Sequence, residues 1–271
     1  MANLRILSSN ATDRALTLVA STTAGALVAS NMQTDLKSQV WRSTTTSATI
    51  TLTWTNSETI GVVAIPYCSF TSTATIRVRG YAVAGSGTTN VDTGTITASP
   101  LSTNANLGVN SYAYGGGASC YVYFTPTSVK QITIDIVDTS NALGYVEIGR
   151  LVMGNYYELA INAEYTTVSS SLTESTVVER SDAGDLRTDR GTMYKTLTFQ
   201  LPWMQSADRD AIWKILRANG MYTPMYVSVV PGSTDGLDEQ IYSIYGKLNK
   251  NSAMTYQFMN QHATTIVVEE I

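Results

Sequence analysis

The chain has 271 residues, 44% of them hydrophobic and only 14% charged, with a formal net charge of −4. This length is enough for two packed domains. Its seventeen Lys and Arg residues are dispersed and its pI is near 5.0, which excludes the clustered positive charge that nucleic-acid binding needs. No apolar run approaches the roughly eighteen residues that span a bilayer. The first sixteen residues lack the basic and apolar regions of a secretory signal. We therefore expect no nucleic-acid partner, no membrane insertion and no signal peptide.

The first 155 residues predict about eight short strands. Ile50 and Leu52 alternate with threonines over 48–53, which predicts a strand with one buried face, and 60–65 is a continuous apolar run typical of a strand buried on both faces. Further strand-like segments follow at 74–83, 93–99, 120–126, 131–138 and 144–154. Short strands at this spacing are typical of a β-sandwich or jelly roll.

The order of these segments resembles the discoidin and galactose-binding-like jelly rolls. The resemblance covers about residues 15–155 and is carried by Ala29-Ser30-Asn31, Trp41-Arg42-Ser43, and the segments 60–65, 76–80, 132–135 and 146–154. It implies a sandwich that binds carbohydrates or lipid head groups through loops at one end. Asp135 falls near a position where that family often has a basic residue, a departure that weighs against sugar binding but not against the fold. The resemblance therefore assigns no ligand residue.

The segment 158–195 is polar and rich in β-branched residues, with too few large apolar residues to bury a core of its own. Two interpretations stand: an extended strand pair that contacts a neighbouring subunit, or a solvated interdomain hairpin. Under the first, the candidate intersubunit contacts are the charged residues Arg180, Asp185, Arg187, Asp189 and Arg190.

The C-terminal part predicts one helix over an antiparallel sheet. Alternation over 195–201 predicts a strand, and strand-like segments recur at 224–231, 241–248 and 263–271. Between them, Ser206 is the expected helix N-cap, Asp208 lies in the first turn and Gly220 is the expected C-terminal stop. The predicted buried stripe of this helix consists of Ala207, Ala211, Ile212, Ile215 and Leu216.

This last part resembles the tube-like, ring-forming domains of siphophage tail proteins, such as distal tail and baseplate components. The resemblance is carried by Leu201-Pro202-Trp203, by the helix ends at 206–210 and 216–220, and by the segments 224–231, 244–248 and 269–271. It implies a ring of three- or sixfold symmetry that docks other phage tail proteins, in the tail of a virion assembled in the host cytoplasm. The expected division is a galactose-binding-like sandwich over 1–155, a polar linker or extended hairpin over 156–194 and a tail-tube-like α+β domain over 195–271. The expected fold class is mainly β.

No catalytic arrangement can be built from the sequence, so we expect no enzyme, no cofactor and no metal. The single histidine, His262, has no partner at triad or metal spacing and is interpreted as a surface or turn residue. Asp182, Asp185 and Asp189 do not have the spacing of a calcium loop. Cys68 and Cys120 lie in apolar strand-like segments and are interpreted as small buried side chains, with a disulfide as the alternative.

Two functions remain open. The first is a structural phage tail subunit, whose sandwich faces outward for decoration or docking. The alternative is a carbohydrate-binding module of an adhesin, with host-surface carbohydrate as partner and with exposed tyrosines stacked on sugar faces. The candidate tyrosines for that sugar or docking surface are Tyr112, Tyr114, Tyr121 and Tyr123, although they alternate as strand residues do and can equally pack against a neighbouring domain.

Overall fold

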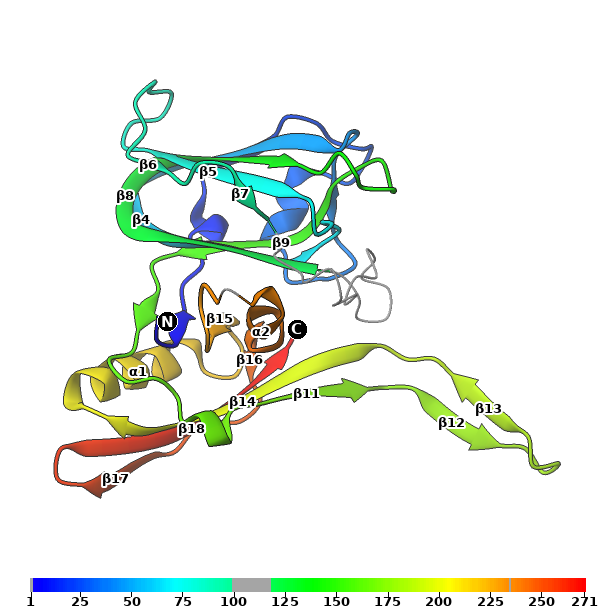
Figure 1. The fold of residues 1–271 in the computed structure, drawn as a ribbon, viewed down its shortest axis with the longest axis vertical. Coiled ribbons are helices and arrows are strands. Elements are labelled where there is room, and N and C mark those ends of the chain that lie inside the picture. The colour runs from blue at the N-terminus through cyan, green and yellow to red at the C-terminus, as the bar shows by residue number, and fades with distance from the viewer. Residues whose placement is uncertain (1, 99–117, 234) are drawn as a thin grey trace.

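The computed structural model describes residues 2–98, 118–233 and 235–271. These residues form two eight-stranded antiparallel sheets, a separate two-stranded sheet and two α-helices (Figure 1). The expected mainly-β fold with a β-sandwich is confirmed. In Figure 1 the sandwich lies above the second sheet, and the two-stranded sheet lies at the end of an arm that projects from the second sheet.

The first eight-stranded sheet folds over on itself to make the sandwich. Its strands are β2 (Thr17–Ala20), β3 (Trp41–Arg42), β4 (Ser47–Cys68), β5 (Thr75–Tyr81), β6 (Val91–Asp92), β7 (Ile96–Thr97), β8 (Ala118–Val137) and β9 (Glu147–Gly154). The 3-10 helices η1 (Thr12–Arg14) and η2 (Ala29–Gln33) pack against it. The segments 48–53 and 60–65, predicted as separate strands, are both part of β4. The β4–β8 pairing shifts register between Thr53 and Glu58, where both strands pass from one layer to the other.

The second half of β4 is buried on both faces. Val63 and Ile65 belong to the core between the sandwich layers, whereas Val62 and Ala64 pack against the second sheet. All eight residues of β9 are buried for the same reason. This double burial explains the unbroken apolar sequence over 60–65, since neither face of the strand meets water.

The second eight-stranded sheet has the order β10-β1-β15-β16-β18-β14-β11, with β17 paired to β18. Its strands are β1 (Arg5–Leu7), β10 (Tyr157–Glu158), β11 (Ser169–Glu174), β14 (Met193–Met204), β15 (Met225–Ser228), β16 (Ser243–Leu248), β17 (Met254–Phe258) and β18 (Gln261–Glu270). Helix α1 (Ser206–Asn219) lies against β14 and β18, as expected. The short helices α2 (Gly236–Ile241) and η4 (Tyr165–Thr167) and the strand β17 were not predicted.

The ends of α1 agree only in part with the prediction. Ser206 is the first helical residue and Gln205 is the N-cap, with no side-chain cap hydrogen bond, so the predicted Ser206 cap is wrong. Gly220 ends the helix as predicted, with a φ of 53° that favours glycine. Ile212 is fully buried, whereas Ile215 and Leu216 are only half-buried.

The sandwich is inserted into the second sheet, which differs from the predicted boundary at residue 155. Strand β1 pairs with β10 and β15, so residues 5–7 belong to the C-terminal sheet. The chain leaves for the sandwich after β1 and returns through β9 into β10. Exit and return lie side by side, because the Ala11 amide donates to the Met153 carbonyl at 2.7 Å. Within the segment expected as a polar linker or extended hairpin, β11 pairs with β14.

Within the described residues, no helix is long and apolar enough to cross a membrane. Cys68 and Cys120 are buried in the sandwich core and are both free thiols, as the first interpretation had it. Burial raises the pKa of the Cys68 thiol to about 12.

Candidate functional site

The chain between β11 and β14 forms a two-stranded arm that extends away from the body (Figure 1). Its distal part pairs β12 (Val177–Arg180) with β13 (Leu186–Asp189), and these strands pair with no third strand of the described chain. Every residue of β12 and β13 is exposed, including Val178 at 56% and Leu186 at 59%. An isolated ribbon with unpaired edges and exposed apolar side chains is typical of a surface that contacts another chain.

The arm holds all five residues predicted as intersubunit contacts, which are exposed: Arg180, Asp185, Arg187, Asp189 and Arg190. Arg180 Nη1 donates to the Gly184 carbonyl at 2.9 Å, which closes the turn at the tip. In the strand register, Arg187 is opposite Glu179 and Asp189 is opposite Val177. Side chains alternate between the two faces of a strand, so Arg187 and Asp189 share one face and Arg180 lies on the other. A contact with another subunit stays a prediction for all five residues.

Tyr121 and Tyr123 do not lie on an open surface. Both are half-buried in the apolar cluster between the sandwich and the second sheet. The Tyr121 ring lies against that of Tyr226 at a centroid distance of 5.2 Å. Packing against the neighbouring domain therefore describes these two residues, and neither offers a free face for a sugar. Tyr112 and Tyr114 lie outside the described residues.

A chain of hydrogen bonds joins the two halves at this cluster. Tyr123 donates its hydroxyl proton to Glu239 Oε1 at 2.6 Å, and the Tyr123 and Tyr226 hydroxyl oxygens are 2.6 Å apart. Because Tyr123 has used its one proton, Tyr226 is the donor between the two. Glu239 also accepts from Ser228 and from the Gly232 amide. Burial raises the pKa of the Glu239 carboxyl above its ordinary value.

Arg150 is a second polar connection between the halves. It projects from β9, and its side chain is only 3% exposed. Its guanidinium donates to both carboxylate oxygens of Asp13 at 2.8 Å and lies 3.0 Å from Asp35 Oδ1. Tyr245 of the second sheet donates to the same Asp35 oxygen at 2.9 Å. Sequence reasoning missed this cluster, although a lone arginine in an apolar strand signals a buried charge that needs partners.

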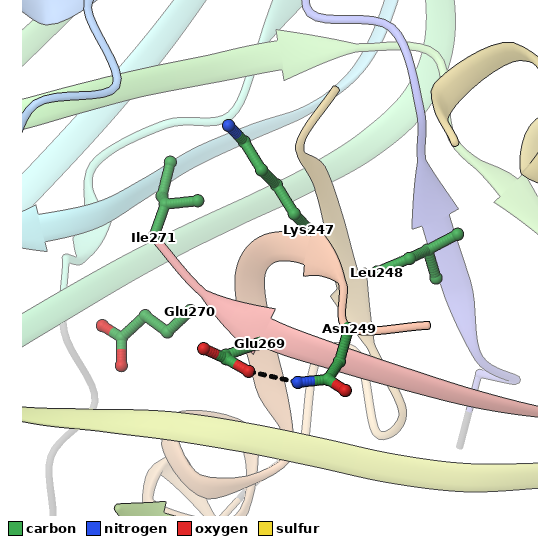
Figure 2. A pocket seen from close by; sticks show the side chains of 6 residues that line it. All are labelled: Lys247, Leu248, Asn249, Glu269, Glu270 and Ile271. Carbon is green, nitrogen blue, oxygen red and sulfur yellow. Dashed lines mark hydrogen bonds between the residues drawn. The ribbon is translucent and has the colours of Figure 1, made fainter. Parts of the chain in front are cut away.

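A hollow at the end of β18 is lined by Glu269 and Glu270, and both carboxylates have structural partners. Figure 2 shows Glu269 beside Asn249, whose side-chain amide donates to it, while Lys247 points away from both glutamates. Glu270 accepts from Lys37 at 2.9 Å and from the Lys195 amide at 2.7 Å. These contacts hold the strand end in place, and the groups do not converge on a common point as acid–base chemistry requires.

His262 lies in β18 and is buried, at 5% exposure, so its interpretation as a surface or turn residue is wrong. Its Nε2 lies 3.0 Å from Arg209 Nη1, and its ring meets the ring of Tyr256 edge-on. Pairing of β18 with both β14 and β17 encloses it. In the described ranges, no group of three or more His, Cys, Asp or Glu side chains is placed to hold a metal ion.

Comparisons with known proteins give weak likenesses. No family model and no curated protein matches the chain. Among solved structures, chitosan-binding module 1 of a chitosanase/glucanase from Paenibacillus sp. IK-5 is 16% identical, with a TM-score of 0.39 over 54% of this chain and 99% of that one. A Streptococcus pneumoniae fucose binding module is 10% identical, with a TM-score of 0.38 over 54% and 94%. A Ruminococcus gnavus GH29 fucosidase is 14% identical, with a TM-score of 0.40 over 55% and 27%.

No function is transferred from likenesses of this size. By its own architecture, the chain is a mainly-β protein in which a sandwich is inserted into a second sheet that carries a projecting arm.

Proposed function

We propose that this protein is a structural subunit that assembles with copies of itself through the arm. The observation that carries the proposal is the β12–β13 ribbon, which is fully exposed and carries apolar side chains at the end of an arm outside the body of the fold. An exposed ribbon of this kind gains backbone hydrogen bonds and apolar burial only when another chain covers it.

The type of assembly follows from the sequence resemblance of the C-terminal part to ring-forming phage tail domains. We propose a closed ring of three- or sixfold symmetry in the tail tip or baseplate of a virion, with the sandwich as a docking surface for other tail proteins. The two polar clusters between the halves support a structural role, because they fix the sandwich on the sheet that would form the ring.

The test is to replace residues 177–189 by an Asn-Gly turn. Glu174 and Met193 are opposite each other in the β11–β14 register, so a short turn can join the two strands beyond them. A longer deletion that begins at residue 166 would also remove β11. Light scattering should give a closed oligomer for the intact protein and a monomer for the variant, and thermal melts should show that the variant still unfolds cooperatively. A variant that keeps the same oligomer would contradict the proposal.

The alternative function is a carbohydrate-binding module. The observation in its favour is the β-sandwich, together with Tyr112 and Tyr114 in the sequence between β7 and β8. Among the described aromatic residues of the sandwich, none is fully exposed, so these two tyrosines are the ones to test. A glycan array with the intact chain and with Tyr112→Ala and Tyr114→Ala would support this function if binding occurs and falls in either variant. Absence of binding in the intact chain would count against it.

A further inference from the structure

An apolar groove lies between α1 and the connection from β16 to β17. It is lined by Trp213, Leu216 and Arg217 on α1 and by Leu248, Asn251 and Ser252 on the other side. Trp213 is 52% exposed, which is high for so large a side chain. The Ser252 hydroxyl is buried and has no hydrogen-bond partner within the described chain. A large exposed ring in an apolar groove indicates a surface that another molecule covers.

The groove and the arm lie at opposite ends of the second sheet. In Figure 1 the arm extends to the right, while α1 and the β17–β18 hairpin lie at the left. A contact between two different surfaces at opposite ends of one molecule is heterologous, and repetition of it either closes into a ring or continues as a filament. The position of the groove therefore fits a contact from the arm of a neighbouring copy.

The charges of the two surfaces are complementary. Arg217 lines the groove, and Lys214 and Lys250 are adjacent in sequence to the lining residues Trp213 and Asn251. All three cations are exposed, and none of them forms an ion pair with a described residue. Residues 177–189 of the arm contain four acidic and two basic side chains, which is a net charge of 2 − 4 = −2. Two of the acidic residues, Asp182 and Asp185, lie in the exposed turn at the tip. Opposite charges at an interface favour encounter and fix its register.

One face of the distal ribbon also has the apolar side chains to fill the groove. Val178 is opposite Thr188, and Arg180 is opposite Leu186. These four residues share a face because alternate residues of a strand point the same way. Val178 and Leu186 thus form an exposed apolar pair beside the acidic turn.

We propose that the groove binds the arm of a second copy of this chain, with Val178 and Leu186 against Trp213 and with the acidic turn beside Lys214 and Arg217. This inference rests on the proposed assembly through the arm and names the surface that receives it. The occupant is the same chain, because the arm supplies an apolar face that matches the apolar groove and a negative charge opposite the exposed cations of α1.

Cross-linking of mixed copies tests the pairing. Val178→Cys in one copy and Trp213→Cys in another should be joined by a short bismaleimide reagent when the two are mixed, and neither variant should cross-link alone. Cys68 and Cys120 are buried and do not compete for the reagent. The matched control mixes Val178→Cys with Lys130→Cys, which places the second thiol on the sandwich strand β8 and should give no product.

Charge reversal tests the same contact in the intact chain. Arg217→Glu should abolish the oligomer seen by light scattering, and Asp185→Arg in the same chain should restore it, with thermal melts to check folding. If replacement of residues 177–189 removes the oligomer but neither cross-link nor rescue occurs, this inference is overturned while assembly through the arm stands. A protein that stays monomeric at its highest soluble concentration overturns both.

Discussion

Arg150 of the sandwich and Tyr245 of the second sheet are joined by two hydrogen bonds, because Nε and Nη2 of Arg150 each lie 3.2 Å from the Tyr245 hydroxyl. The same hydroxyl donates to Asp35, which also receives the arginine. The guanidinium is thus satisfied from both halves of the molecule. These partners are needed because the Arg150 side chain is only 3% exposed, and a buried charge is costly without partners.

Replacement of Arg150 should therefore lower the free energy of unfolding. We expect Arg150→Gln to cost about 3 kcal/mol, at the low end for breaking a buried pair because Asp13 and Asp35 reach solvent. Urea denaturation measures the change. The matched control is Arg14→Gln, whose bridge to Glu58 is half-exposed and should contribute about 0–1 kcal/mol. Equal effects of the two substitutions would contradict a structural role for Arg150.

The helix on the second sheet gives a graded prediction. Ile212→Ala should cost about 2–5 kcal/mol because the side chain is fully buried. Ile215→Ala and Leu216→Ala should cost less, since both side chains are half-buried. Ser206→Ala should have almost no effect, because no side chain caps this helix. Thermal melts in which Ser206→Ala is as harmful as Ile212→Ala would contradict the observed N-terminus of α1.

The sequence predicts the features that depend on neighbouring residues. Alternation over 195–201 identifies β14, and Gly220 identifies the end of α1, because periodicity and backbone freedom are local properties. The identity of the distant segment that covers a given side chain leaves no such signal. Asp208 is not part of the predicted apolar stripe, yet it is buried, and the Tyr157 hydroxyl and the Ala160 amide donate to it.

The same limit applies to the pairing of β1 with the C-terminal sheet and to the packing of Tyr121 and Tyr123. Residues 5–7 are too few to show periodicity, and their partners in β15 are more than two hundred residues away. Alternation of Tyr121 and Tyr123 shows that they share one face of a strand, but not which other segment covers that face. The arm differs from these cases, because its lack of large apolar residues signals in the sequence that it has no core of its own.

Lys195 should make stability depend on pH at the alkaline side. Burial lowers the pKa of its ammonium group from 10.5 to about 8. At pH values between these two pKa values, the unfolded chain binds more protons than the folded one. The free energy of unfolding therefore rises as the pH increases from about 8 and falls again as the pH decreases through 8. Relative to Lys195→Met, the native protein should therefore gain stability with rising pH in urea titrations. Lys214→Met controls for loss of a lysine at an exposed site, and a constant difference between native protein and Lys195→Met would contradict the shift.

The insertion of the sandwich predicts which fragments fold. A fragment of residues 156–271 lacks β1, so the edge of β15 loses its partner and the core loses Leu4 and Ile6. We expect this fragment to be unfolded or aggregated by circular dichroism and light scattering.

The matched variant joins residues 2–9 to 154–271 through a short Gly/Ser linker. Ser9 and Gly154 lie next to each other, since a Cβ added to Gly154 would come within 2.8 Å of the Ser9 carbonyl oxygen, so the linker adds no strain. Both molecules lose the sandwich and expose the same surface of Tyr226 and Tyr245, and they differ only in β1 and the short stretch that joins it to β10. The joined variant should melt cooperatively and the shorter fragment should not. Cooperative melting of both at the same temperature would show that β1 is dispensable and that the second sheet is an independent domain after residue 155.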